Sequence, residues 1–440
     1  MLSLPVQAAP SQFGALFDAD TKAAIASGLC IQCRGAKLLC GKTRCPILVR
    51  WDSMMKTAPM IDRMDLDGSS PPGVFVGRFG YPKVYVGPLV PPIHGDTQIL
   101  DAPEAWVGRP MEDIVHFRSQ LVRGMHRVHV HDVDRGGRIV DLTRELALGS
   151  SPADVEAGFA RKPHGRVVLD DNVQPFGPSA PLHRLEIGTV KVDPNLERAS
   201  ADTDLYAKEA VLDLYGRGAP VSRIQRAFSV GAFGLEKNRK FVPTRWSITA
   251  VDDTIGKELR ERVKAFPLLN EIRVHEAIGF DDRFLVVMIP RPWRYELIEA
   301  WYPNTLWNPL GREVVMFGDH EGFEGRTTYA SIGGCYYAAR LAVGEALNRD
   351  RRQAATVILR ETHPGYIMPV GVWNVREHVR EALRRPSRTF ATIAETLAYL
   401  RTRLDIPMER YVRISDVLSY VLHQRTFDDF DLLAAARAQG

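Results

Sequence analysis

The second half of the chain alternates between two hydrophobic patterns. Apolar residues spaced by three or four indicate amphipathic helices, whereas short continuous apolar runs indicate strands that are buried on both faces. The helical stripes are Ile255, Leu259, Val263 and Phe266, with Asp253 as the expected N-cap, then Tyr337, Leu341, Gly344 and Leu347, then Ile393, Leu397, Leu400 and Leu404. The strand runs are 284–290, 313–317 and 355–359. Helices and strands without a strict repeat predict an α+β or mixed α/β fold with a mixed sheet core.

The first half is less regular. Prolines and glycines interleave with short Val-aromatic-Val runs over 66–98, which predicts short strands joined by turns. Helical spacing over 112–123 precedes a strand candidate at 126–132, where His129 and His131 would share one face and His126 the other; an exposed basic face explains them better than a metal site. Residues 160–200 are rich in Pro, Gly and polar side chains, which predicts a surface excursion or a domain connection.

Composition places the chain among ordinary globular proteins. Its 440 residues are 45% hydrophobic and 25% charged, and this length suggests two or three domains. The net charge of +4 does not by itself indicate a nucleic-acid or membrane partner. No run approaches the roughly 18 apolar residues that span a bilayer, and the first ten residues do not resemble a signal peptide. We therefore expect a cytoplasmic protein without a membrane partner.

Four of the five cysteines lie within sixteen residues: Cys30, Cys33, Cys40 and Cys45. A Cys-x-x-Cys pair followed by a second pair supplies the four soft ligands of a tetrahedral zinc site. Gly41 directly after Cys40 fits a turn with positive φ. An iron–sulfur cluster uses the same ligands, and unligated or redox cysteines are the other alternative. We predict a small N-terminal zinc module whose closed site is structural rather than catalytic.

Several longer blocks carry a family resemblance. They are the cysteine run 30–46, the segment 70–88, the block 237–250 with its Pro-Thr-Arg-Trp-Ser core, and the sequence Gly-Asp-His-Glu-Gly at 318–322. Together they resemble the archaeal Nre DNA-repair proteins over most of the chain. The resemblance implies a role in DNA damage repair, with DNA as a partner. It also implies a zinc finger near the N-terminus in one subgroup and a C-terminal peptide that binds the DNA sliding clamp in many members.

The tail matches that clamp-binding peptide only in part. Gln424, Phe427 and Phe430 stand at the expected positions, while Asp431 replaces the second aromatic residue. Such a peptide inserts apolar side chains into a groove on the clamp, so the missing ring should weaken binding. The alternative is an amphipathic helix end, in which the two phenylalanines face the core.

Two polar blocks are candidates for binding or chemistry. The first contains Arg239, Arg245, Trp246 and Ser247, which together suit a phosphate and a stacked base; the alternative is a cationic turn that leads into a strand. The second contains Asp319, His320 and Glu321 after an apolar strand, where they could ligate a metal or move protons; the alternative is a solvated turn. Arg376, Arg380 and Arg384 recur every four residues among glutamates, which predicts an ordinary solvated helix face.

The chain divides into four expected regions: 1–48 with the zinc module, a Pro/Gly-rich α/β region at 49–200, a second α/β region at 201–405 with both polar blocks, and 406–440 with a helix and the tail. The leading hypothesis is a DNA damage repair protein with a structural zinc finger, possible clamp recruitment and no assigned reaction. One alternative is an enzyme acting on a nucleotide or nucleic acid, in which the two blocks converge in one pocket. Another is a zinc-stabilised scaffold that does not bind DNA. The common P-loop, Gly-x-Ser-x-Gly and His-Glu-x-x-His signatures are absent from the sequence.

Overall fold

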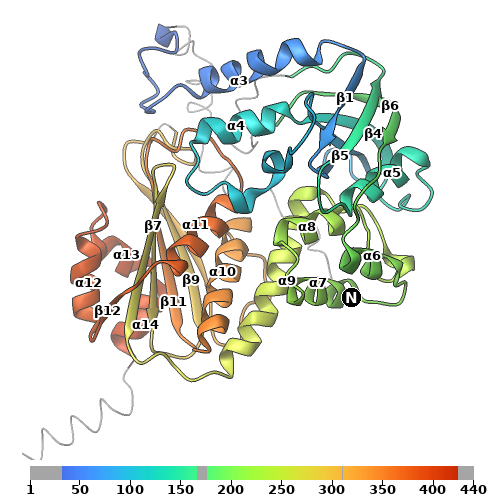
Figure 1. The fold of residues 1–440 in the computed structure, drawn as a ribbon. Coiled ribbons are helices and arrows are strands. Elements are labelled where there is room, and N and C mark those ends of the chain that lie inside the picture. The colour runs from blue at the N-terminus through green and yellow to red at the C-terminus, as the bar shows by residue number, and fades with distance from the viewer. Residues whose placement is uncertain (1–31, 166–175, 310, 425–440) are drawn as a thin grey trace, which may run out of the picture.

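Two six-stranded sheets organise the chain (Figure 1), as described by a computed structural model over residues 32–165, 176–309 and 311–424. Each sheet has one pair of parallel neighbours among antiparallel ones. This arrangement confirms the expected mixed sheet core. Within the described ranges, no helix has the length and apolarity needed to cross a membrane.

The first sheet has the strand order β1–β5–β6–β4–β3–β2. Its strands are β1 (Asp65–Ser70), β2 (Val74–Val76), β3 (Lys83–Val90), β4 (Val122–His129), β5 (Ala153–Phe159) and β6 (Ser179–Ile187). The position of β6 corrects the expectation that 160–200 is a surface excursion or connection. It is an inner strand because Ala180, Leu182 and Leu185 supply buried side chains within a mostly polar sequence.

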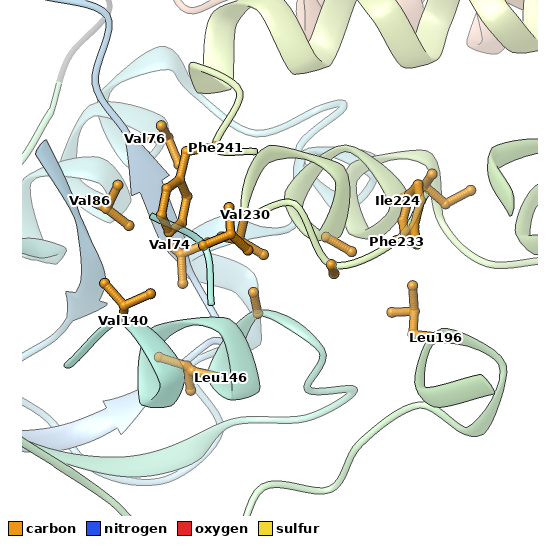
Figure 2. Close-up of a cluster of buried hydrophobic side chains, with 14 of the residues drawn as sticks. Val74, Val76, Val86, Val140, Leu146, Leu196, Ile224, Val230, Phe233 and Phe241 are labelled. Carbon is orange, nitrogen blue, oxygen red and sulfur yellow. The ribbon is translucent and has the colours of Figure 1, made fainter. Parts of the chain in front are cut away.

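One face of this sheet packs on short helices. The helices of this half are α3 (Pro46–Ile61), α4 (Met111–Gln120), α5 (Arg138–Ala147), α6 (Pro194–Ala201), α7 (Ala207–Gly216) and α8 (Val221–Ser229), with 3-10 turns at Gln98–Asp101, Pro103–Ala105 and Glu236–Asn238. Figure 2 shows Val74, Val76 and Val86 gathered beside Phe241, with Val140 of α5 below them. These alternate positions of β2 and β3 therefore point into the core, and the positions between them point away from it.

The second sheet has the order β10–β9–β11–β8–β7–β12. Its strands are β7 (Ile272–Gly279), β8 (Asp282–Ile289), β9 (Arg294–Trp301), β10 (Val315–Glu321), β11 (Ala355–Thr362) and β12 (Arg388–Phe390). Helices α10 (Gly334–Asp350) and α11 (Trp373–Arg384) cover one face, and α12 (Ile393–Arg401), α13 (Met408–Ile414) and α14 (Asp416–His423) cover the other (Figure 1). Since both faces are covered, the inner strands read as the continuous apolar runs seen in the sequence.

Helix α9 (Thr244–Lys264) runs between the two halves, beside α7 and α8 on one side and α10 on the other (Figure 1). Its residues Val251, Ile255 and Leu259 belong to the core of the first half, together with Leu341 of α10. The helix begins at Thr244, so Asp253 lies in its middle and is not the predicted N-cap. Asp253 is kept there by an ion pair with Arg340, a contact between distant parts of the sequence.

Candidate nucleic-acid interface

Three of the four predicted zinc ligands lie in the segment that leads into α3. Cys33 is buried, Cys40 and Cys45 are half-buried, and all three thiols are free; Cys30 lies outside the described residues. The backbone N–H of Leu39 holds the pKa of the Cys33 thiol below its usual value, against the opposing effect of burial. Zinc binds the thiolate form, which this shift favours, but Cys33, Cys40 and Cys45 do not form a convergent group of ligands among the described residues.

The cysteine segment is attached to both halves of the protein. Gly41 has a φ of +69°, which confirms the turn expected after Cys40, and a Cβ there would lie 2.3 Å from the side chain of Asn304. Lys42 Nζ donates to the carbonyl oxygen of Asn304 at 2.7 Å, and Arg44 forms an ion pair with Glu112 of α4. The segment is thus packed against the rest of the chain on two sides.

The first polar block, 237–250, forms the approach to α9 and its first turns, not the turn into a strand that was the alternative. Arg239 donates to the carbonyl oxygens of Gly234 and Asp202 at 2.8 and 2.7 Å. Ser247 is buried and donates to a carbonyl oxygen of α8. Arg245 and Trp246 are exposed at the start of α9. The block therefore divides into residues that hold the fold and two that face solvent.

In the second block, Glu321 is fully buried. Its carboxylate accepts hydrogen bonds from Trp293 Nε1 at 3.2 Å, the Tyr336 hydroxyl at 3.1 Å and Arg340 Nη1 at 2.8 Å. Arg340 Nη2 also reaches Asp253 Oδ1 at 2.5 Å. Glu321 thereby ties β10 to α10 and, through Arg340, to α9, and both of its oxygens are occupied.

The other two residues of this block point to separate partners. Asp319 pairs with Arg326 Nη1 at 2.8 Å and accepts from the Ser331 N–H at 2.6 Å. Burial opposes its ionisation, but these hydrogen bonds outweigh that effect and hold its pKa below the usual value. His320 is half-exposed, with Nε2 3.6 Å from Asp416 Oδ2 on α14. Alternation along β10 places His320 on the face opposite Asp319 and Glu321.

The enzyme alternative expects Arg245 and His320 to reach one cavity. A half-open cavity of about 470 Å³ lies between α7, α9 and α11, where Tyr215, Arg262 and Arg380 contribute to its lining, and neither predicted block contributes to it. Arg380 is already paired with carboxylates of α10 and α11. This cavity therefore gives the enzyme alternative no support.

The arginines of α11 correct a prediction. Arg376 is buried rather than solvated, and its Nη1 lies 3.0 Å from both carboxylate oxygens of Asp252 in α9. Arg380 pairs with Glu345 of α10 at 2.7 Å, whereas Arg384 is exposed. Charge periodicity predicted pairs within one helix, but the acidic partners of the buried arginine include one from far away in the sequence.

One group of potential metal ligands converges among the described residues. Ligand atoms of Glu361, His363 and Asp405 lie within 4.8 Å of one another. The carboxylate of Glu361 already accepts from two backbone N–H groups and from the Tyr411 hydroxyl, and Arg283 lies 2.8 Å from Asp405. These protein donors account for the acidic groups as a polar contact that joins β11 to the α12–α13 connection.

Exposed aromatic rings and arginines gather instead around the β2–β3 connection and the start of α9. We call this surface the aromatic–basic face; it comprises Arg78, Phe79, Tyr81, Tyr85, Arg127, Arg245 and Trp246. The exposed fractions of its rings are 76% for Phe79, 43% for Tyr81, 39% for Tyr85 and 40% for Trp246. Large aromatic side chains normally bury most of their surface, so four partly exposed rings in one region suggest a binding surface.

The register of the first sheet places part of this face. Tyr85 of β3 lies opposite Arg127 of β4, and the Arg127 guanidinium is 5.9 Å from the centre of the Tyr85 ring. Val84 and Val86 on either side of Tyr85 are buried. This alternation turns Tyr85 and Arg127 outward as a consequence of burying the valines.

Helix α9 supplies the rest of the face and is fixed to the hairpin. The N–H of Val76 donates to Thr244 Oγ1 at 2.9 Å, at the first residue of the helix. Within the same turn, the rings of Trp246 and Tyr81 meet with their centres 5.2 Å apart and their planes tilted by 52°. The aromatic pair is therefore assembled from two distant segments, and exposed Arg245 stands next to Trp246 in the chain.

The sequence pointed to Arg245 and Trp246 but not to the other members of the face. A usable signal was present, because Arg78, Phe79 and Tyr81 fall in a turn between two apolar strands, where the core does not require aromatic residues. The pairing of Tyr85 with Arg127 has no such signal, since it depends on strand register. The structure therefore adds five residues to the predicted pair: Arg78, Phe79, Tyr81, Tyr85 and Arg127.

Comparison with protein families matches nearly all of the described chain. The family model described as Archaeal Nre, N-terminal, matches residues 39–308, and the model described as Archaeal Nre, C-terminal, matches residues 321–430. The first match contains the whole aromatic–basic face. No solved structure matches the chain.

Curated relatives match over similar lengths. DNA repair protein NreB of Archaeoglobus fulgidus is 42% identical over 91% of this chain and 99% of its own length. DNA repair protein NreA of the same organism is 35% identical over 86% of this chain and 94% of its own length. DNA repair protein NreA of Haloferax volcanii is 36% identical over 72% of this chain and 78% of its own length. With two family models and these relatives in agreement, the chain belongs to the archaeal Nre family.

Proposed function

We propose that this chain is a DNA repair protein that binds DNA directly through the aromatic–basic face. The repair role rests on the relatives, which are named DNA repair proteins. The observation that carries direct binding is the exposed pair of Tyr81 and Trp246, together with the exposed cation Arg245 in the same turn of α9. Rings that stack on bases and cations that neutralise phosphates recur together on nucleic-acid-binding surfaces.

The position of the cations supports this proposal. Arg127 is exposed, and its guanidinium lies near an exposed ring rather than against a buried carboxylate. Arg239, Arg376 and Arg340 differ from it, because hydrogen bonds within the fold occupy their guanidinium groups. A phosphate can therefore reach Arg127 without breaking a buried ion pair.

DNA binding by the Arg127→Ala/Arg245→Ala double variant tests the proposal. The probe is a fluorescent duplex with a single-stranded overhang, titrated at several salt concentrations. We expect the variant to bind more weakly. The slope of log affinity against log salt should fall by about 0.9 for each duplex phosphate that the variant no longer neutralises.

Arg401→Ala is the matched control, because Arg401 is an exposed arginine on α12 that pairs with Glu409. The control should bind like the unmodified protein. Equal affinity and equal salt slope for the double variant and the control would contradict the proposed interface. Failure of the unmodified protein to bind the probe would contradict direct DNA binding altogether.

We also propose that Cys30, Cys33, Cys40 and Cys45 hold a structural zinc ion, which would stabilise the segment before α3. The lowered pKa of Cys33 and the positive φ of Gly41 support this ligand set. Metal analysis of the purified protein should find about one zinc per chain, lost in Cys30→Ser and Cys45→Ser. Cys335→Ser, which changes a cysteine of α10, should keep the metal. Iron with visible absorption, or no metal, would count against zinc.

We further propose that the tail recruits the protein weakly to the DNA sliding clamp. Gln424 is exposed directly after α14, while Phe427 and Phe430 lie outside the described residues. Two apolar side chains that enter a clamp groove should account for most of the affinity. Phe427→Ala/Phe430→Ala in the full chain should abolish binding to the clamp in a titration. Unchanged clamp affinity would remove this part of the proposal.

A further inference from the structure

We infer that the aromatic–basic face recognises unpaired DNA bases, so that its preferred ligand is single-stranded DNA rather than an intact duplex. This inference rests on the proposed function, because it names the substrate class of the same surface. The evidence lies in the exposure of the rings, the arginines near two of them and the fixed backbone that carries them.

Phe79 is the most informative residue of the face. It lies in the β2–β3 connection with 76% of its surface exposed, and the Arg78 guanidinium is 4.9 Å from the centre of its ring. A phenyl ring has no hydrogen-bonding group, so an exposed phenylalanine can offer a ligand only its apolar ring surface. The face of a DNA base is a planar partner of suitable size for such a contact.

The other rings repeat this combination of aromatic surface and positive charge. Tyr81 and Trp246 form a tilted pair, with Arg245 on the same helix turn, and Tyr85 lies beside Arg127. Arg78 and Arg127 lie near the rings of Phe79 and Tyr85, and rings with cations close by suit a nucleic-acid strand, in which each base carries one phosphate. Guanidinium planes can also stack on bases that have left the helix.

Base pairing decides which form of DNA can use these rings. In a duplex, each base face is covered by its neighbours in the stack, and only base edges reach the grooves. A ring can stack on a base only when that base is unstacked or single-stranded. A surface that offers several exposed rings should therefore bind single strands better than a blunt duplex of the same sequence.

The backbone that carries the rings is well braced. The N–H of Gly77 donates to the Tyr85 carbonyl at 2.7 Å, and the N–H of Lys83 donates to the Gly80 carbonyl at 2.9 Å. Gly80 has a φ of +82°, which suits glycine at this turn. Together with the Val76 to Thr244 hydrogen bond, these contacts hold the ring-bearing turn against α9 before DNA arrives. Binding then requires little ordering of the protein.

Titration of two probes tests the inference: a fluorescent oligo-dT of about 20 nucleotides, which has no self-pairing, and the same strand in a blunt duplex with oligo-dA. We expect oligo-dT to bind at least about ten-fold more tightly than the duplex. Phe79→Ala and Trp246→Ala should each weaken oligo-dT binding by about ten-fold, within the range of a single stacked base, and change duplex binding by less than about two-fold.

Tyr206→Ala is the matched control, because Tyr206 is an exposed aromatic residue at the start of α7. It should leave both affinities unchanged. A second readout separates stacking from charge: the ring variants should keep the salt slope for oligo-dT, whereas Arg127→Ala should lower it by about 0.7. Circular dichroism confirms that each variant is folded.

Each outcome has a distinct meaning. Equal affinity for the two probes, or equal weakening of both by Phe79→Ala, overturns the inference while leaving DNA binding in place; the second result would indicate that the ring wedges into a duplex step. Ring variants that affect neither probe overturn the inference as well, and would indicate that the rings contact a protein. No binding to either probe contradicts the proposed function itself.

Discussion

Replacing Arg340 with methionine should destabilise the protein strongly, because the buried carboxylate of Glu321 then keeps only a more distant cation, Arg260, whose Nη1 lies 3.8 Å from Oε1. Both side chains have 0% exposed surface, and Arg340 Nη1 lies 2.8 Å from Glu321 Oε2. Removing one partner of a buried ion pair typically costs about 3–5 kcal/mol. Methionine keeps an unbranched apolar stem but removes the guanidinium, which lies 5.9 Å from the ring centre of Tyr336 and 5.5 Å from that of Tyr337.

The hydrogen bonds of Glu321 place the expected loss near the lower end of that range. Trp293 and Tyr336 still donate to its two oxygens after the substitution, so neither oxygen loses every hydrogen bond. Asp253, the second partner of Arg340, is partly exposed and keeps Lys257 at 2.7 Å. We therefore expect Arg340→Met to lower the free energy of unfolding by about 3 kcal/mol.

A double-mutant cycle in urea, followed by far-ultraviolet circular dichroism, measures this effect. Glu321→Gln in the Arg340→Met background removes the buried charge; its amide oxygen can accept from Trp293 Nε1, and its amide nitrogen can donate to the Tyr336 hydroxyl. The double variant should therefore recover at least about 1 kcal/mol relative to additive losses. A loss below about 1 kcal/mol in Arg340→Met, or strict additivity in the double variant, would refute the reasoning.

Three further predictions concern stability. Burial raises the pKa of Asp252 to about 6, so between about pH 4 and 6 the folded state keeps a proton that an unfolded aspartate has lost. As the pH rises through this range, the free energy of unfolding should therefore fall by up to about 1.4 kcal/mol per pH unit. Urea titrations at several pH values should show this dependence, and Asp252→Asn should make it weaker. Gly87→Ala places a Cβ 1.8 Å from the Gly124 carbonyl oxygen of β4. In urea titrations, this variant should lose about 1–3 kcal/mol of unfolding free energy. An unchanged value would mean that β3 and β4 can move apart at this point without cost. Ser415→Ala removes a donor to buried Glu296 and the cap of α14, whose Leu418 N–H lies 3.0 Å from Ser415 Oγ; the melting temperature should fall as expected for about 1–2 kcal/mol, and an unchanged value would mean that water replaces both hydrogen bonds.

The buried elements were the most predictable from sequence. The apolar runs at 284–290 and 355–359 became β8 and β11, and the stripe from Tyr337 to Leu347 became part of α10. These patterns are local, because a strand buried on both faces shows as a continuous apolar run and a helix buried on one side shows as apolar residues spaced by three or four. β6 was missed for the same reason, since its three buried residues stand among polar ones.

The candidate site was less predictable because it depends on distant contacts. The partner of Arg376 is Asp252, separated by 124 residues, and nothing in the local spacing distinguishes this pair from a solvated one. Similarly, Trp246 contacts Tyr81 only in the tertiary structure, because the two residues come from α9 and the β2–β3 connection. The residue types of the first block predicted Arg239, Arg245, Trp246 and Ser247 as candidates. Only the tertiary structure shows that Arg245 and Trp246 are exposed, while Arg239 and Ser247 form hydrogen bonds within the fold.

The shared helix α9 also constrains how this chain can be made and divided. Leu341 of α10 belongs to the hydrophobic core of the first half, although the N-terminal family match ends at residue 308. A fragment ending at residue 308 would leave that core open to water beside Ile255 and Leu259. We therefore expect a fragment cut at the boundary between the family matches to expose this part of the core and to aggregate more readily than the whole chain.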